Sequence, residues 1–307
     1  MFEFDIKPAL LWASVGIIIL LICATLIIKL LPYKEELNAR LRSWWWMAGI
    51  FIIAMLMDPM ISLIMMGFLS FLAFKEYLSL IPTRRADRRV LLWAYLSIPL
   101  QYYWISIAWY GVFIIFIPVY MFLLLPIRML LIGETQGFLK AAGTLHWGLM
   151  ITVFCLSHAA YLLVLPDAVN PIAGSAGLLL FLIFLTEFND VLQYVWGKLL
   201  GKHKIIPKVS PNKTWEGFLG GLVTTTLLAT LLAPWLTPLT FLQSIFFGAL
   251  IATAGFFGDV TLSALKRDLG IKDSGNILPG HGGILDRVDS LTYTAPLFFH
   301  GLIYLHY

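Results

Sequence analysis

Long apolar runs dominate this sequence of 307 residues. Hydrophobic residues make up 60% of it and charged residues only 12%, a balance that a soluble chain of this length does not carry. A helix needs roughly 20 apolar residues to cross a bilayer. The sequence therefore predicts an all-α fold, a polytopic membrane helix bundle. The candidate spans are Ala9–Leu31, Val90–Trp109, Val112–Leu131, Thr144–Leu165, Ile172–Trp196, Phe218–Leu236, Phe241–Leu265 and Leu291–Tyr307.

The stretch Trp44–Phe74 is apolar too, but Asp58-Pro59 interrupts it. Each half is only about 14 residues long, a length that leaves half-spanning and re-entrant segments open as alternatives. In every case the pair returns to the side of the membrane that it left. We therefore expect about eight to ten membrane segments in the whole chain.

Lysine and arginine set the orientation of such a bundle, because they are enriched in its cytoplasmic loops. The basic loops are 32–43, 75–89, 127–143, 197–216 and 266–289. With ten segments and both termini outside, all five loops face the cytoplasm, and Lys7 is the one residue of the 21 basic residues placed outside. We predict an inner-membrane protein whose chemistry faces the cytoplasm. This placement of the charges argues against a nucleic-acid partner.

The densest polar stretch runs from Ser263 to Asp289. It holds eight charged residues of a chain that has only 21 basic and 17 acidic ones. Such polarity between apolar runs is costly near a bilayer, so it points to chemistry or to ion movement. Its cations can hold phosphates and its aspartates can hold a hard divalent metal, which together suggest phosphoryl or nucleotidyl transfer. The cations are Lys266, Arg267, Lys272 and Arg287, and the acids are Asp268, Asp273, Asp286 and Asp289.

A helical face at the start of this stretch carries four polar residues. Asp259, Ser263, Lys266 and Arg267 stand at i, i+4, i+7 and i+8, so they share one side of an apolar helix. The alternative is that Asp259 only pairs with a distant cation. A carboxylate near membrane depth is a functional-site hypothesis by default. We therefore predict a catalytic role for Asp259.

The loop 279–283, with the sequence PGHGG, follows in the same stretch. Its glycines let backbone N–H groups approach a ligand closely. Asp286 and Asp289 come next, spaced so that they face the same way on the first turns of the last helix. They could instead only stabilise that helix N-terminus, by about 0.3–1 kcal/mol. One acid fits this alternative well, whereas two acids beside Arg287 fit it poorly.

A second polar segment begins with Asp190, at the edge of an apolar helix, and continues into a lysine-rich loop. On charge alone, the loop fits equally well a cytoplasmic loop that touches anionic lipid head groups. Ser210-Pro211 looks like a helix start, with serine as the N-cap and proline as the first helical residue. Lys213 and Thr214 would then lie in the first turn, where free N–H groups favour an anion. The segment predicts a phosphate cradle, with ordinary capping as the alternative.

Together these motifs resemble the phosphatidate cytidylyltransferase (CDP-diacylglycerol synthase) family. The family signature, S-x-apolar-K-R followed by K-D, P-x-H-G-G and D-R-x-D, is met from Ser263 to Asp289 without a departure. A second family element, P-K-V-S-P-x-K-T, is met from Pro207 to Thr214. Over the N-terminal half, the resemblance rests on hydropathy and on the element FLAFKEY. The chain thus divides into N-terminal membrane segments, 1–143, and a C-terminal catalytic bundle, 144–307, with cytoplasmic loops 197–216 and 266–289.

The resemblance implies an enzyme that joins CTP to phosphatidic acid and so makes CDP-diacylglycerol and pyrophosphate for phospholipid biosynthesis. It implies Mg²⁺ bound by Asp259, Asp286 and Asp289, with a second cation and a homodimer left open, and membrane lipids around the bundle. Catalysis is assigned to these three aspartates with Lys266 and Arg267. Substrate binding is assigned to Asp190, Lys208, Ser210, Pro211, Lys213, Thr214, Ser263, Lys272, His281, Gly282, Gly283 and Arg287.

One element departs from the family pattern. Members carry D-S-x-A-Y before the lysine loop, whereas this chain has Asp190-Val191-Leu192-Gln193-Tyr194. A related nucleotidyltransferase that acts on a different lipid phosphate is therefore an alternative. An ion-coupled transporter is less favoured, because the polar residues are concentrated in inner loops and not distributed through several spans. A non-catalytic scaffold is disfavoured by the intact aspartates.

Overall fold

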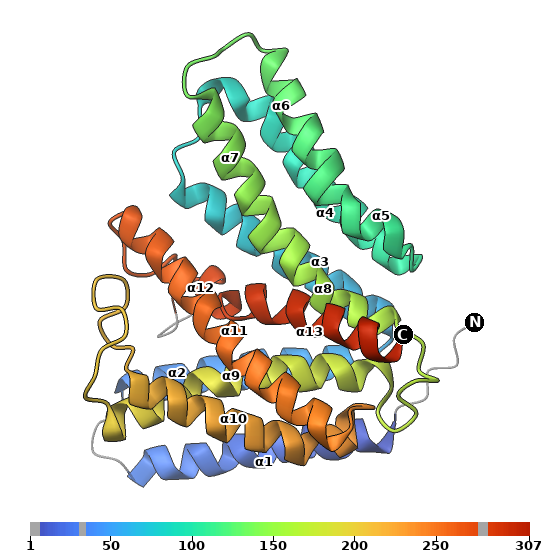
Figure 1. The fold of residues 1–307 in the computed structure, drawn as a ribbon, viewed down its shortest axis with the longest axis vertical. Coiled ribbons are helices and arrows are strands. Elements are labelled where there is room, and N and C mark those ends of the chain that lie inside the picture. The colour runs from blue at the N-terminus through green and yellow to red at the C-terminus, as the bar shows by residue number, and fades with distance from the viewer. Residues whose placement is uncertain (1–6, 31–34, 276–281) are drawn as a thin grey trace.

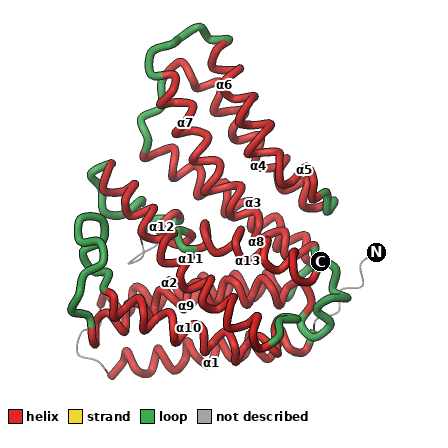
Figure 2. Tube along the Cα trace, in the orientation of Figure 1, coloured by secondary structure: helices red, strands yellow, loops and turns green. Residues whose placement is uncertain are grey.

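The computed structural model describes residues 7–30, 35–275 and 282–307. Within these ranges the chain is helical and has no strand beyond an isolated bridge between Lys204 and Thr214. This confirms the prediction of an all-α membrane protein (Figure 2). In the described part, seven helices are long and apolar enough to cross a membrane: Pro8–Leu30, Pro59–Leu80, Tyr110–Leu130, Phe138–Val164, Gly174–Leu200, Trp215–Leu236 and Phe241–Asp268.

Two of these seven helices contain a π-helical turn, η2 at Phe116–Met121 and η3 at Met150–Phe154. In η2 the irregularity coincides with Pro118, because proline has no N–H to donate. The first of these two helices consists of α5, η2 and α6, and the second of α7, η3, α8 and η4. The bounds are α1 Pro8–Leu30, α2 Glu35–Met55, α3 Pro59–Leu80, η1 Arg85–Asp87, α4 Arg88–Ser106, α5 Tyr110–Ile115, η2 Phe116–Met121, α6 Phe122–Leu130, α7 Phe138–Leu149, η3 Met150–Phe154, α8 Cys155–Tyr161, η4 Leu162–Val164, α9 Gly174–Leu200, α10 Trp215–Leu236, α11 Phe241–Asp268, α12 Leu285–Val288 and α13 Leu291–His306.

The helices form two groups (Figure 1). In the C-terminal group, α10 packs against both α9 and α11, and α13 packs against α11 and α8. The N-terminal group is built from α3 to α8 and extends to the top of Figure 1, while α1 lies against α9 and α10. Helix α3 also contacts the short helix α12. It therefore joins the N-terminal group to the polar C-terminal segment.

The structure corrects the prediction for Trp44–Phe74. Helix α2 has 21 residues and α3 has 22, so neither is a 14-residue half, and α3 alone is long enough to span. Asp58 does separate them, because its side chain accepts a hydrogen bond from the N–H of Met60 at 2.7 Å and caps α3. Helix α3 also extends past Phe74, since it includes Lys75 and Glu76 and continues to Leu80.

The predicted spans Val90–Trp109 and Leu291–Tyr307 also form helices, α4 and α13. Neither is among the seven spanning candidates of the described residues. Helix α13 has only 16 residues, and α4 begins with a pair of arginines. Both helices line the bundle and bury one face within it, including Phe298 of α13 and Ala94 of α4.

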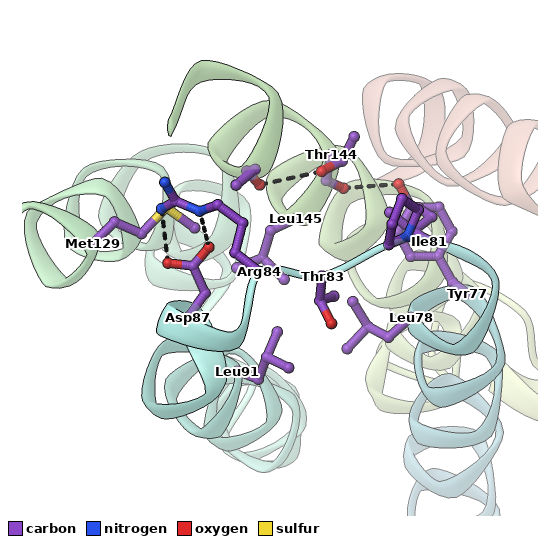
Figure 3. A pocket seen from close by; sticks show the side chains of 12 residues that line it. Tyr77, Leu78, Ile81, Thr83, Arg84, Asp87, Leu91, Met129, Thr144 and Leu145 are labelled. Atoms are coloured by element: carbon purple, nitrogen blue, oxygen red, sulfur yellow. Dashed lines mark hydrogen bonds and ion pairs between the residues drawn. The ribbon is translucent and has the colours of Figure 1, made fainter. Parts of the chain in front are cut away.

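Helix α3 is held in a defined rotation by Tyr77. This side chain is fully buried, and its hydroxyl donates a hydrogen bond to the carbonyl of Thr144 at 2.8 Å (Figure 3). A Cβ on Gly148 would overlap the Tyr77 ring, so only glycine allows this approach of α7. Arg84 and Asp87 form an ion pair with 2.6 Å between Nε and Oδ2 beyond the end of α3, and both line a small cavity beside Tyr77. None of the predicted site residues lies in that cavity.

Candidate active site

Helices α9 and α11, the loop before α10 and the segment from α12 to α13 bring the predicted polar residues together. Asp190 comes from α9, Lys213 from the loop before α10, and Asp259 from α11. The turn between α12 and α13 lies against α11, and a Cβ on Gly258 would be 2.5 Å from the carbonyl oxygen of Asp289. Glycine at this position therefore allows the turn to reach the helix that carries the neighbouring Asp259.

Lys213 and Asp259 form an ion pair in which Nζ lies 2.7 Å from Oδ2. The same Nζ donates a hydrogen bond to Oε1 of Gln193 at 3.2 Å. Burial on its own lowers the pKa of Lys213, but the carboxylates of Asp259 and Asp190 outweigh burial and raise it. The lysine is thus a fixed positive charge within the bundle.

Lys266 and Asp286 form a second ion pair, with 2.7 Å between Nζ and Oδ1. The other carboxylate oxygen of Asp286 accepts hydrogen bonds from the N–H groups of Ser274 at 2.9 Å and Gly283 at 3.0 Å. Burial raises the pKa of Asp286, but Lys266 and these N–H groups outweigh burial and hold the pKa below its usual range. Gly282 has a φ of +79°, and a Cβ there would overlap this carboxylate.

Asp190 and Asp289 meet around Ser290. The hydroxyl of Ser290 lies 2.8 Å from Oδ2 of Asp190, to which it donates, and its N–H donates to Oδ1 of Asp289 at 2.7 Å. Burial and the nearby carboxylates of Asp259 and Asp190 raise the pKa of Asp289 well above its usual value. The three acids therefore share a region with an excess of negative charge, which favours a cation.

Two buried polar atoms in this region have no hydrogen-bond partner among the described residues: Oδ1 of Asp190 and Nε of Arg287. Buried polar atoms in folded proteins are normally paired, so these two are suited to a ligand. A ready-made metal cluster of three His, Cys, Asp or Glu side chains is not present in the part of the chain that the structure describes. In the described structure, Lys213 pairs with one carboxylate oxygen of Asp259, and Lys266 pairs with one of Asp286.

The residues of the predicted polar face of α11 contact two different partners, the carboxylates of the site and the backbone of neighbouring loops. Ser263 donates to Oδ1 of Asp259 at 3.2 Å, and Lys266 reaches Asp286. Arg267 instead donates to the carbonyl of Val209 at 3.2 Å and to that of Ile271 at 3.2 Å. Arg267 therefore ties the lysine-rich loop to the end of α11.

The remaining predicted residues lie at the periphery of this cluster. Lys208, Pro211 and Lys272 are exposed, and Ser210 is half-buried. His281 lies outside the described residues. Asp286 and Asp289 are predicted on the first turns of one last helix, but Asp286 lies in α12, which ends at Val288, and Asp289 lies in the turn before α13 begins at Leu291.

The predicted helix start at Ser210-Pro211 is wrong. Helix α10 begins at Trp215, and its N-cap is Thr214, whose hydroxyl accepts a hydrogen bond from the N–H of Gly217 at 3.1 Å. The preceding residues pair with the other arm of the loop, since the N–H of Ile205 donates to the carbonyl of Lys213. This pairing keeps Lys213 out of the helix and directs it toward Asp259.

Sequence reasoning missed Glu76 and Ser274 as members of the site. Glu76 is buried, and its carboxylate accepts hydrogen bonds from Ser274 Oγ and from the N–H groups of Ile284 and Leu285. The available signal was a carboxylate at the end of the apolar run 59–80, in the element FLAFKEY. Charged residues so close to membrane depth are functional hypotheses by default.

The cluster combines largely buried cations with carboxylates that lie within the spanning helices α9 and α11 and in the segment from α12 to α13. Fixed lysines of this kind can hold and neutralise phosphate groups. Carboxylate oxygens are the ligands that a hard divalent cation prefers. The arrangement is therefore suited to chemistry between polyanions at a membrane surface.

Comparison with known proteins agrees with this chemistry. The model of the cytidylyltransferase family matches residues 38–305. The chain is 45% identical over 294 residues to the Escherichia coli (strain K12) protein named Uncharacterized protein YnbB, covering 94% of this chain and 96% of that protein. The chain belongs to the cytidylyltransferase family, and it is a membrane-embedded nucleotidyltransferase.

Relatives named phosphatidate cytidylyltransferase match a shorter region. The Bacillus subtilis (strain 168) protein is 47% identical over 113 residues, which cover 36% of this chain and 42% of that protein. The Helicobacter pylori (strain ATCC 700392 / 26695) protein is 45% identical over 126 residues, 41% of this chain and 47% of that protein. The matched region thus spans less than half of these enzymes.

Proposed function

We propose that this enzyme transfers the cytidylyl group of CTP to phosphatidic acid and so forms CDP-diacylglycerol and pyrophosphate. The observation that carries the proposal is the pair of ion pairs, Lys213–Asp259 and Lys266–Asp286, built from motifs that resemble phosphatidate cytidylyltransferases. An oxygen of the lipid phosphate attacks the α-phosphorus of CTP, and the bond to the pyrophosphate leaving group breaks. The lipid phosphate is ionised near neutral pH, so no strong general base is needed.

The chain's own cations supply the electrostatic part of this reaction. Two polyanions must approach each other, and charge develops on the pentacoordinate phosphorus and on the leaving group. Lys213 and Lys266 are fixed by their aspartate partners, and the Nε of Arg287, which has no hydrogen-bond partner among the described residues, is assigned as a further donor. Preorganised charges of this kind stabilise a transition state without reorganising during the reaction.

We assign Mg²⁺, the metal that the family resemblance implies, to the carboxylates of this cluster. Two features favour a hard cation with oxygen ligands: Oδ1 of Asp190 has no hydrogen-bond partner among the described residues, and negative charge is in excess around Asp289. We assign Asp259, Asp286 and Asp289 as the residues that bind the ion. The same carboxylates could also bind a second cation. When bound, the ion would neutralise phosphate charge.

The setting that we propose is the cytoplasmic side of the inner membrane, where CTP is dissolved and phosphatidic acid is embedded. One observation favours a different lipid phosphate as a second candidate acceptor. Gln193, which stands in a stretch that departs from the family pattern, contacts the central Lys213. A substitution at such a position can change which head group is accepted.

The experiment is transfer of label from α-labelled CTP to lipid by the purified protein with Mg²⁺ and phosphatidic acid. We expect organic-soluble label and an equal amount of pyrophosphate, both abolished by EDTA. Label that enters another lipid phosphate, but not phosphatidic acid, would establish the second candidate. Absence of label in every lipid phosphate, in a preparation with a native melting transition, would contradict both.

A further inference from the structure

Glu76 is a carboxylate of the N-terminal group that is buried against the C-terminal catalytic segment. It is 6% exposed, and its carboxylate accepts hydrogen bonds from the N–H of Ile284 at 2.8 Å and of Leu285 at 3.1 Å. It also accepts one from the hydroxyl of Ser274. Among the described residues, no cation pairs with it. A buried carboxylate is costly unless it is hydrogen-bonded, so these three donors define its place.

The chain around Glu76 is shaped for this contact. A Cβ on Gly283 would overlap Oε1 of Glu76, and a Cβ on Gly275 would be 3.2 Å from Oε2. On α3 itself, the next residue, Tyr77, is buried against α7 and fixes the rotation of the helix. Two independent features, the glycines and the tyrosine, therefore direct this carboxylate to the same place.

The contact leads directly to an ion pair of the site. The hydroxyl of Ser274 donates a hydrogen bond to Glu76, and the backbone N–H of Ser274 donates one to Asp286. The N–H of Gly283 donates a hydrogen bond to Asp286, and the N–H groups of the next two residues, Ile284 and Leu285, donate to Glu76. The backbone that positions Asp286 is thus fixed from one side by Glu76 and from the other by the pair of Asp286 with Lys266.

We infer that Glu76 is a positioning residue for nucleotidyl transfer, which holds residues 283–285 and Ser274 so that Asp286 and Lys266 keep their geometry. It acts through the backbone and does not touch the reacting atoms. The N-terminal group is then part of the active site and not only a membrane anchor. The inference rests on the proposed function for the identity of the substrates, but the anchoring contact itself does not.

The test compares wild-type protein with Glu76→Gln in detergent. The glutamine has nearly the same shape, but its NH₂ group replaces one acceptor oxygen and faces a backbone donor. We expect kcat to fall by about tenfold or more, while KM for CTP changes less than about threefold and the melting transition is retained. The matched control is Glu134→Gln, an exposed carboxylate in the loop after α6, which should keep wild-type kcat.

Amide hydrogen exchange supplies a readout that needs no substrate. The N–H groups of Ile284 and Leu285 should exchange slowly in wild type and faster in Glu76→Gln. Unchanged exchange would overturn the anchoring contact, and faster exchange with wild-type kcat would overturn the positioning role. If Glu76→Gln does not fold, Ser274→Ala decides, because it removes one donor only; a kcat within twofold of wild type would then reject the inference.

The failure of the proposed function would look different. Wild-type protein would not label phosphatidic acid, although exchange at Ile284 and Leu285 would still be slow in wild type and fast in the variant. The kinetic comparison is then made with the lipid phosphate that wild type does accept. A wild type without any acceptor, or without slow exchange at these two amides, would overturn the inference itself.

Discussion

Gln193 is buried next to the central lysine of the site. Its Oε1 accepts a hydrogen bond from Lys213, and its Nε2 lies 3.5 Å from the carbonyl of Ala252. Val191, two residues earlier, is 37% exposed on the outer side of α9. The two departures from the family pattern therefore have different surroundings. Only Gln193 belongs to the network that holds Lys213.

Replacing Gln193 with alanine should change substrate choice. The loss of an amide contact to Lys213 alters the hydrogen-bonding set of the site, and such changes discriminate between substrates more strongly than changes in apolar contacts. We expect the ratio of kcat/KM with CTP to that with dCTP or UTP, or with phosphatidic acid to that with another lipid phosphate, to move by about threefold or more. Val191→Ser is the matched control and should leave each ratio unchanged. Equal ratios in both variants would show that Gln193 only packs.

The aspartates of the two ion pairs should each be required for turnover. Asp259→Asn and Asp286→Asn keep the side-chain volume, but they remove the charge that holds a lysine and that a hard cation needs. We expect initial rates at saturating Mg²⁺ to fall to below about a tenth of wild type. Asp268→Asn, an exposed acid at the end of α11, is the control and should retain activity. More than a tenth of wild-type activity in either variant would remove that residue from the set of direct ligands.

The lowered pKa of Asp286 links stability to pH. A carboxylate with a lowered folded-state pKa stabilises the fold above its unfolded value, about 4, and this contribution is lost as pH falls through the folded-state value. Wild type should therefore melt at a higher temperature than Asp286→Asn at pH 6. That difference should narrow as the pH is lowered from about 5 toward 3. Thermal melts of both proteins in one detergent measure it, and a difference that grows on acidification would contradict the assignment.

At the scale of elements, close approach of α11 to the turn between α12 and α13 builds the site. A Cβ on Gly258 would lie 2.5 Å from the carbonyl oxygen of Asp289 and 3.0 Å from Cα of Ser290. Ser290 also donates to the carbonyl of Gly255, one turn earlier on α11, at 3.1 Å. Gly255 and Gly258, two small residues on one face of α11, thus allow the backbone of this helix to approach the backbone of the turn. Larger residues there would move Asp289 away from Asp259.

Gly258→Ala should lower both stability and activity. The added methyl group meets backbone atoms, which cannot move aside as a flexible side chain can, and overpacking of this kind costs about 1–3 kcal/mol. Gly143→Ala is the control, because a Cβ there has nothing within 4 Å and the helix gains about 0.4–1 kcal/mol. Melting temperature and initial rate should both decrease in the first variant, while the second should melt at or above the wild-type temperature. A wild-type rate for Gly258→Ala would show that the turn tolerates displacement.

At the scale of the molecule, the polar loops and the chain ends lie on opposite sides. In Figure 1 the first turn of α1 and the last turn of α13 are on the right, whereas the loop before α10 and the end of α11 are on the left. The basic loops predicted to face the cytoplasm include both of those on the left. This agrees with an arrangement in which one membrane surface carries the chemistry and the other carries short connections.

Cysteine labelling tests this orientation. In a variant that lacks Cys23 and Cys155, a single cysteine is placed at Lys202, which is exposed in the loop before α10, or at Ile172, which is 50% exposed before α9. We expect an impermeant reagent to label Ile172→Cys in sealed cells, and Lys202→Cys only after the membrane is opened. The reverse pattern would place the active site outside the cell. Cytoplasmic CTP could then not be its substrate.

The sequence by itself determined that the chain is an all-α membrane protein. Apolar runs of spanning length can only be helical here, because a bilayer leaves backbone groups no partner except each other. The spacing of Asp259, Ser263 and Lys266 likewise placed them on one face, as the helix shows. These inferences succeed because helix periodicity and bilayer thickness act over short distances along the chain.

Only the tertiary structure decided which of these residues touch. Pairing between the two arms of the lysine-rich loop moved the start of α10 to Trp215, against the local preference of Ser210-Pro211. Glu76 meets Ile284 across 208 positions of sequence, because Tyr77 fixes the rotation of α3 and Gly283 leaves room for the carboxylate. Contacts between such distant segments depend on how whole helices pack, and local patterns of capping, charge and hydropathy carry no information about that packing.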